Sequence, residues 1–128
     1  MPLVLVIDDD PQMRATVRRM LTSSGHAVIE ASDGCEGLAA FQSHAPDVVI
    51  TDIMMPGKEG LETIIELRAT GHAKILAISG SWAGGDADFL QMAKKLGADL
   101  VLQKPFRAAE LQEAVNVLTA ASTESGSL

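Results

Sequence analysis

The sequence predicts a three-layer α/β sandwich, in which a five-stranded parallel sheet lies between two layers of helices. Short apolar runs rich in Val and Ile alternate with segments of helical periodicity, which is typical of a parallel sheet buried on both faces. Gly and Pro separate successive segments, as expected for turns between strands and helices. At 128 residues, of which 47% are hydrophobic, the chain has the size of one domain with a sizeable core.

Five short runs are predicted to form the strands, because each is rich in aliphatic residues and is bounded by turn residues. They comprise residues 3–7, 26–31, 47–51, 74–78 and 99–102. The first run ends at Asp8, the third ends at Asp52, and the fifth is soon followed by Lys104. Charged residues therefore stand at the ends of three predicted strands.

Helices are predicted between the strands, where apolar residues recur three or four positions apart. Asp10 and Pro11 indicate the start of the first helix, because aspartate caps a helix and proline suits its first position. We interpret Asp33 and Asp86 as helix caps for the same reason. Helical segments thus connect each strand to the next, as parallel strands require.

The last helix is predicted from residue 107 to about residue 121, with an apolar face that packs on the sheet. The residues that follow are small and polar. We therefore expect one domain over residues 1–121 and a flexible C-terminal tail over residues 122–128.

The ends of the predicted strands carry the residues that are most informative about function. In a parallel α/β sheet the carboxyl ends of the strands lie along one edge, where ligands bind. Asp8, Asp9, Asp52, Ser79 and Lys104 are all expected at that edge. Carboxylates that lie close together repel each other, and a divalent cation relieves this repulsion. The pattern therefore indicates metal-assisted phosphate chemistry.

Composition and charge exclude several other classes of function. The net charge of −7 and the pI of about 4.8 argue against direct binding to nucleic acid. No run approaches the ~18 apolar residues of a membrane span, so a cytoplasmic protein without membrane contact is expected. Cys35 stands alone, which excludes an intrachain disulfide, and it is expected to be buried. His26, His44 and His72 are scattered near turns and are expected to be solvated rather than to bind zinc.

Four stretches of the sequence, taken together and in this order, resemble the receiver domain of bacterial two-component response regulators. They are residues 4–10, 46–57, 78–80 and 104–106. The resemblance extends from residue 3 to about residue 118. It implies a flavodoxin-like fold with strand order 2-1-3-4-5 and five helices, similar to that of chemotaxis regulators.

The resemblance also implies a role in signal transduction. Such a domain accepts a phosphoryl group from a sensor histidine kinase or a histidine phosphotransfer protein, in a phosphorelay. The phosphoprotein then switches a surface that binds a downstream protein target. The domain catalyses its own phosphorylation and dephosphorylation, although it acts mainly as a switch.

By position in the matching motifs, Asp52 is the residue that resembles the phosphoacceptor. The resemblance implies a Mg²⁺ ion held by Asp9, Asp52 and the backbone carbonyl of Met54, with Asp8 acting mainly through a water molecule. The alternative for a strand-end aspartate is a helix cap, but the loop that follows Asp52 offers no immediate helix to cap.

Lys104 and Ser79 complete the set of residues implied by the resemblance, each through a contact with an oxygen of the phosphoryl group. The alternative for Lys104 is a solvated surface lysine, and Ser79 could simply begin a turn. The combination with Asp52 favours the functional interpretation of both.

One position departs from the family pattern. In many receiver domains an aromatic residue on the fifth strand swings inward after phosphorylation, but Val101 occupies that position here. A β-branched side chain has little rotamer freedom, so this switch cannot operate. The output is then expected from residues 79–85, the next helix or Trp82. A receiver that binds its partners without phosphorylation is an alternative.

A phosphatase similar to the haloacid dehalogenases is the main rival among enzymes. Asp8 and Asp10 match its Asp-x-Asp motif, but it needs a later pair of acidic residues, and Asp52 would have no role. The acidic residues after Lys104 do not follow a strand; they are Glu110, Glu113 and Glu124. A flavin-binding carrier is disfavoured because no phosphate-binding loop follows the first strand.

Overall fold

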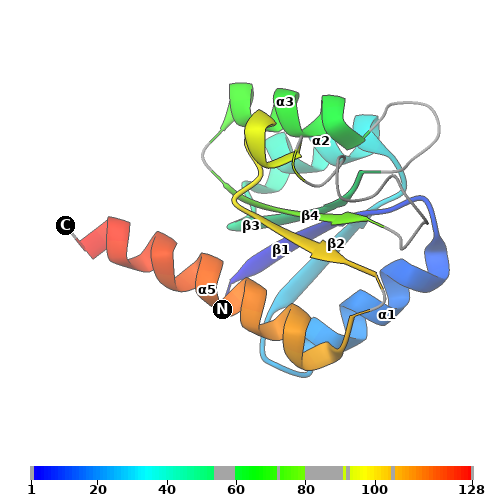
Figure 1. The fold of residues 1–128 in the computed structure, drawn as a ribbon, viewed down its shortest axis with the longest axis vertical. Helices are drawn as coiled ribbons and strands as arrows, with labels where there is room; N and C mark the ends of the chain where they lie inside the picture. Colours follow the sequence, from blue (N-terminus) through cyan, green and yellow to red (C-terminus); the bar gives the residue numbers. More distant parts are fainter. Residues whose placement is uncertain are drawn as a thin grey trace.

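The computed structural model describes residues 2–53, 60–71, 73–79, 91, 93–104 and 106–127. Five strands form a parallel sheet in the order β2-β1-β3-β4-β5 (Figure 1). The strands are β1 (Leu3–Ile7), β2 (Ala27–Ala31), β3 (Val48–Asp52), β4 (Lys74–Ser79) and β5 (Leu100–Gln103). The predicted fold class and strand order are confirmed.

Helices cover both faces of the sheet (Figure 1). α1 (Pro11–Thr22) and α5 (Ala108–Ser127) pack together on one face. α2 (Gly34–His44) and α3 (Gly60–Thr70) pack together on the other. Residues 93–96 are also helical and belong to the segment where a further helix was predicted. Within the described part of the chain, no helix has both the length and the apolar character needed to cross a membrane.

The alternation of side chains along β1 explains how this strand is buried on both faces of the sheet. Val4 and Val6 pack in the cluster beneath α1 and α5, whereas Leu5 and Ile7 pack in the cluster beneath α2 and α3. All four side chains are at most 1% exposed. A strand buried on both sides has no polar face, which accounts for the continuous apolar run in the sequence.

Two of the predicted helix caps are present in the structure. A carboxylate oxygen of Asp10 accepts from the amide of Gln12 at 2.9 Å, and Pro11 follows as the first helical residue of α1. Asp33 accepts from the amide of Glu36 at 2.8 Å and caps α2. Asp86, the third predicted cap, lies outside the described residues.

The last helix is longer than expected. The backbone of α5 is helical up to Ser127, beyond the predicted end near residue 121. Figure 1 shows its final turns extending past the amino edge of the sheet. The domain boundary at residue 121, and the flexibility of residues 122–128, stay predictions.

Two side chains are placed differently from the expectation. His26 is only 7% exposed rather than solvated, because a turn at Gly25 (φ 93°) brings its amide to the carbonyl of Leu21, at the end of α1. Cys35 is exposed rather than buried, because α2 turns Gly34, Gly37 and Phe41 toward the interior. Both differences depend on how an element packs and not on the residue type alone.

Candidate functional site: an acidic pocket at the carboxyl edge of the sheet

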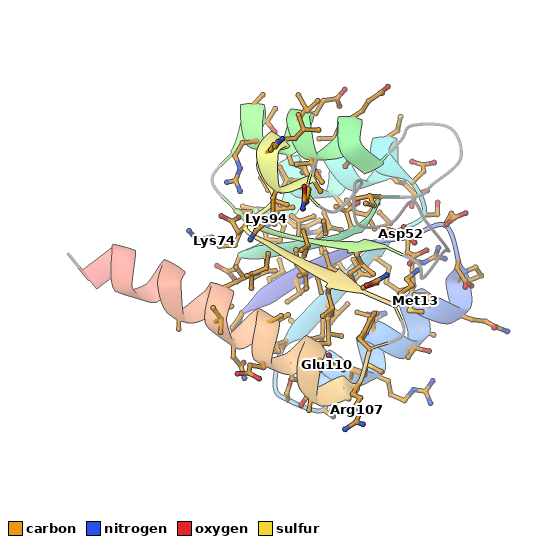
Figure 2. The ribbon with its side chains drawn as sticks, in the orientation of Figure 1. Met13, Asp52, Lys74, Lys94, Arg107 and Glu110 are labelled. Carbon is orange, nitrogen blue, oxygen red and sulfur yellow. The ribbon has the colours of Figure 1, made fainter. Side chains whose placement is uncertain are left out.

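Strand pairing brings two predicted aspartates together. β1 pairs with β3 so that Ile7 lies opposite Thr51, and the next residues are Asp8 and Asp52. Both aspartates are buried, with exposures of 4% and 6%. Figure 2 shows Asp52 at the carboxyl end of the sheet, opposite the end that carries Lys74.

Three carboxylates form a cluster at this edge. Asp8, Asp9 and Asp52 each offer one oxygen, and these oxygens all lie within 4.8 Å of one another. Asp9 is exposed, whereas Asp8 and Asp52 are buried, so the cluster opens to solvent on one side. Hard oxygen donors with room for water molecules fit a small divalent cation such as Mg²⁺.

Lys104 supplies a positive charge to the same cluster. Its Nζ lies 2.8 Å from Oδ2 of Asp52 and 3.5 Å from Oδ2 of Asp8. Burial lowers the pKa of Lys104, but the hydrogen bond and charge of Asp52 outweigh this effect, with help from Asp8, so the pKa is raised. The ammonium group therefore stays charged and is aimed at Asp52.

The surroundings of Asp8 raise the pKa of its carboxyl group. Burial is the main cause that raises its pKa from 3.8 to about 6. The charges of Asp52 and Asp9 raise it as well, whereas a hydrogen bond from the Asp10 amide and the charge of Lys104 lower it. A bound cation would favour the ionised form, so protons and a cation compete for this group.

The structure describes the backbone of Ser79 but no part of Met54. Ser79 is the last residue of β4 and lies opposite Gln103 of β5, so its backbone reaches the edge that carries the pocket. Its side chain lies outside the described part, as do the whole of Met54 and Trp82. The roles implied for these residues stay predictions.

Residues 4–116 match the model of the family described as the response regulator receiver domain. The chain belongs to this family. Its role in accepting a phosphoryl group, which the sequence predicted, is supported by this membership, and the rival functions are not favoured.

Two relatives illustrate the relationship. Transcriptional regulatory protein KdpE of Mycobacterium tuberculosis (strain ATCC 25618 / H37Rv) is 40% identical over 126 residues, which cover 95% of this chain and 54% of that protein. Response regulator MprA of Mycobacterium avium (strain 104) is 40% identical over 115 residues, which cover 84% of this chain and 46% of that protein. The receiver domain thus spans about half the length of the curated relatives it matches.

Solved structures support the same assignment. A response regulator receiver domain protein from Clostridium thermocellum superimposes with a TM-score of 0.88 at 32% identity, covering 96% of this chain and 98% of that one. The receiver domain of NtrX from Brucella abortus superimposes with a TM-score of 0.83 at 30% identity, covering 90% of this chain and 96% of that one.

Two of the acidic residues that the rival phosphatase could use after Lys104 lie away from the pocket of this receiver domain. Glu110 and Glu113 are exposed on α5, and Glu110 accepts from the amide of Arg107 at 2.9 Å. Figure 2 shows Arg107 and Glu110 at the start of α5, away from Asp52. The side chain of Glu124 lies outside the described part of the chain.

Val101 lies against the core of the receiver domain. It pairs with Ala77 of β4 and packs, partly buried, against the cluster beneath α2 and α3. A short branched side chain in this position has no ring to move inward. The expectation that the output uses another route stays a prediction.

Sequence reasoning missed a contact at the acidic pocket that involves Arg14. Its Nη1 donates to the backbone carbonyl of Asp8 at 2.7 Å, and its Nε donates to Glu30 at 3.2 Å. Arg14 and Arg18 lie four residues apart on α1, which carries no acidic residue of its own. Because α1 offers them no acidic partner, the two arginines are expected to bind groups on another element.

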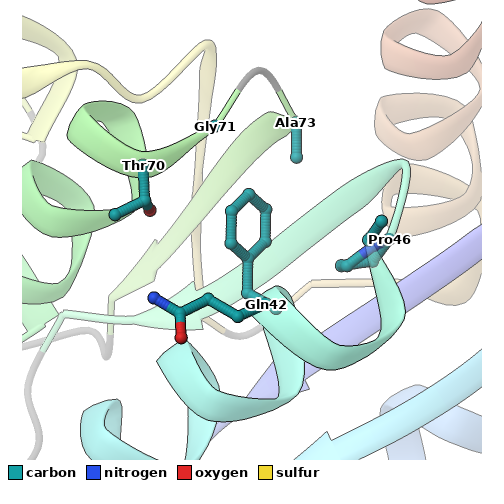
Figure 3. A pocket seen from close by; sticks show the side chains of 7 residues that line it. Gln42, Pro46, Thr70, Gly71 and Ala73 are labelled. Carbon is teal, nitrogen blue, oxygen red and sulfur yellow. The ribbon is translucent and has the colours of Figure 1, made fainter.

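The receiver domain also has a hollow far from the carboxylates. It has a volume of about 360 Å³ and lies where α2 and α3 end, at the amino edge of the sheet (Figure 3). None of the lining residues that the structure describes is charged; they are Phe41, Gln42, Ala45, Pro46, Thr70, Gly71 and Ala73. These described residues supply none of the groups that phosphate chemistry requires.

Proposed function

We propose that this receiver domain accepts a phosphoryl group on the carboxylate of Asp52. The observation that carries the proposal is the ion pair of 2.8 Å between Lys104 and Asp52, beside the carboxylates of Asp8 and Asp9. The donor is a phosphohistidine on a sensor histidine kinase or a histidine phosphotransfer protein. The phosphorylated domain then binds a downstream protein target, and the reaction takes place in the cytoplasm.

The chemistry at Asp52 is a direct transfer between two nucleophiles. A carboxylate oxygen of Asp52 attacks the phosphorus, an O–P bond forms, and the P–N bond of phosphohistidine breaks. The electron pair of that bond returns to the imidazole nitrogen. Lys104 exchanges part of its contact with Asp52 for a phosphoryl oxygen, and Ser79 donates its hydroxyl to another. Positioning and charge neutralisation account for most of the rate in this class of reaction.

We also propose that the domain requires Mg²⁺. Asp9 and Asp52 would hold the ion, with Asp8 acting mainly through a water molecule. The backbone carbonyl of Met54 is assigned from the family resemblance alone. When bound, the ion neutralises part of the carboxylate charge and so reduces the repulsion of the incoming phosphoryl group.

The proposal is tested by locating the phosphoryl group after incubation with a phosphorylated histidine kinase and Mg²⁺. Peptide mass spectrometry should place it on Asp52, and Asp52→Asn should abolish the modification. Asp10→Asn is the matched control, because asparagine caps a helix as well as aspartate does and should leave the reaction intact.

Two outcomes would overturn the assignment. One is a phosphoryl group on a different side chain. The other is a wild-type chain that carries no phosphoryl group after incubation with a kinase that does phosphorylate its own receiver. Loss of the reaction in Asp10→Asn, with Asp52→Asn still active, would instead support the phosphatase mechanism.

A further inference from the structure

Arg14 joins the acidic pocket to the edge strand of the sheet. Its Nη1 donates to the carbonyl of Asp8 at 2.7 Å, and its Nε donates to Oε1 of Glu30 on β2 at 3.2 Å. Its side chain is only 18% exposed, which is low for an arginine. Glu30 also accepts from Arg18, whose Nη1 lies 2.7 Å from Oε2.

The carbonyl that Arg14 binds belongs to the peptide group between Asp8 and Asp9. This peptide group decides how the two carboxylates are oriented relative to each other. The Asp8 amide already donates to Ala31 at 3.1 Å, and the Asp8 carboxylate accepts from the Asp10 amide at 2.9 Å. Arg14 adds a charge-assisted hydrogen bond on the remaining polar group of Asp8. This bond opposes rotation of the peptide group, and such a rotation would move the two carboxylates relative to each other.

Arg18 makes a similar set of contacts but does not reach the pocket. Its Nη1 binds Glu30, and its Nη2 donates to the carbonyl of Val28 at 3.0 Å, within β2. The two arginines therefore share a helix, an anionic partner and a type of backbone contact. They differ in which carbonyl each binds, and only the carbonyl bound by Arg14 belongs to a residue of the cluster.

We propose that Arg14 is a positioning residue for the cation site, and that Glu30 anchors it. Arg14 holds the peptide between Asp8 and Asp9 in the orientation at which both carboxylates approach Asp52. It thereby sets the affinity for the divalent cation, while the nucleophile and Lys104 act independently of it. This inference rests on the proposed function, because it assigns a role toward the Mg²⁺ ion of that site.

The test compares Arg14→Met with Arg18→Met, which removes the matched arginine. We expect Arg14→Met to raise the dissociation constant for Mg²⁺, measured by calorimetry, by about tenfold, as is common when a group that orients a metal ligand is removed. Arg18→Met should leave this constant unchanged. At saturating Mg²⁺, Arg14→Met should reach nearly the wild-type rate of phosphorylation.

A second readout needs no metal. In the metal-free domain, the amide nitrogen of Asp9 belongs to the peptide group whose carbonyl Arg14 binds. We expect its NMR chemical shift to change in Arg14→Met and to stay unchanged in Arg18→Met. If Arg14→Met does not fold, Arg14→Lys serves instead, and a single ammonium should restore only part of the affinity because it lacks the fork of donors.

The outcomes separate the two proposals. Equal effects of the two methionine variants on Mg²⁺ affinity, or a lower maximal rate at unchanged affinity, would overturn the role of Arg14. Tight Mg²⁺ binding without phosphorylation of the wild-type domain would count against the proposed function alone. Absence of Mg²⁺ binding to the wild-type domain would overturn both.

Discussion

Three carboxylates and one ammonium group share the acidic pocket, and the position of each depends on where a strand ends. Asp8 follows β1, Asp52 ends β3 and Lys104 follows β5. Because strand ends on adjacent parallel strands are neighbours, small shifts in register would separate these groups. The chemistry of each residue thus depends on the pairing of the strands that carry it.

Lys104→Met removes the ammonium group from the pocket. We expect the rate of phosphorylation at Asp52 to fall by roughly 100-fold, because a charge-assisted donor to the transferred group is lost. We also expect Mg²⁺ to bind more tightly, since Nζ of Lys104 no longer lies 2.8 Å from Asp52. The measurements are a phosphorylation time course and a calorimetric titration.

Lys94→Met is the control for this prediction, because Lys94 is exposed and lies at the opposite end of the sheet from Asp52 (Figure 2). Its rate and its Mg²⁺ affinity should equal those of the wild type. A wild-type rate in Lys104→Met would show that the ammonium group takes no part in the transfer.

At the scale of helices and strands, the sequence predicted the structure best where neighbouring residues alone determine it. The strands were predicted from continuous apolar runs, and the starts of α1 and α2 from Asp10 and Asp33. β3, β4 and β5 each extend one residue further than predicted, to Asp52, Ser79 and Gln103. Strand ends carry weak local signals, because pairing with a neighbour determines them.

The remaining features depend on contacts between elements that are distant in sequence. The burial of His26 follows from the turn after α1, and the exposure of Cys35 follows from the face that α2 turns inward. The contact of Arg14 with the Asp8 carbonyl requires the approach of α1 to the end of β1. The aspartates and the lysine of the site were predicted because they stand at strand ends, whereas Arg14 lies within a helix.

Two valines of α5, two residues apart in the sequence, can test which face of this helix packs on the sheet. Val115 is fully buried, whereas Val117 is 51% exposed. We expect Val115→Ala to lower the free energy of unfolding by about 2 kcal/mol, through lost burial and the cavity that remains. Val117→Ala should change it by less than about 0.5 kcal/mol. Urea denaturation measures both, and equal effects would contradict the observed packing.

Arg68 on α3 connects two other segments, the turn before β4 and the turn before β5, and its removal should loosen that side of the domain. It donates to the carbonyl of Gly97 at 3.1 Å and to that of Ala73 at 3.2 Å, and it pairs with Asp99 at 2.6 Å. We expect Arg68→Met to cost about 2 kcal/mol, because partly buried acceptors lose a charged donor. Thermal unfolding provides the measurement, with exposed Arg19→Met as the control. A loss no larger than that of the control would contradict this role.

For the whole molecule, the pocket couples stability to pH. The folded domain raises the pKa of Asp8 from 3.8 to about 6, so between these values the folded state holds more protons than the unfolded state. The free energy of unfolding in metal-free solution should therefore contain a contribution from Asp8 that falls as pH rises through this window. Allowing for solvent and for Lys104, we expect this contribution to be about 1–2 kcal/mol.

Denaturation at several pH values measures this contribution as the difference between the wild type and Asp8→Asn, which cannot titrate. The two curves should approach each other below the window and separate above it, with the variant relatively more stable at high pH. Parallel curves would contradict the raised pKa of Asp8.

Addition of Mg²⁺ should reverse the loss of stability at higher pH. At a concentration of ten times its dissociation constant, we expect a gain of about 1.4 kcal/mol in the free energy of unfolding. Because protons compete with the cation for Asp8, a fixed Mg²⁺ concentration should stabilise the domain more at pH 8 than at pH 5. Equal gains at both pH values would argue that Asp8 does not contribute to binding.

Both ends of the described chain leave the molecule at the edge opposite Asp52, since β1 begins there and α5 extends past it (Figures 1 and 2). An affinity tag or fluorescent protein fused to either end would therefore leave the pocket open. Immobilisation on a sensor chip through residue 127 would direct Asp52 toward the flowing solution, where kinases and cations could be injected in turn.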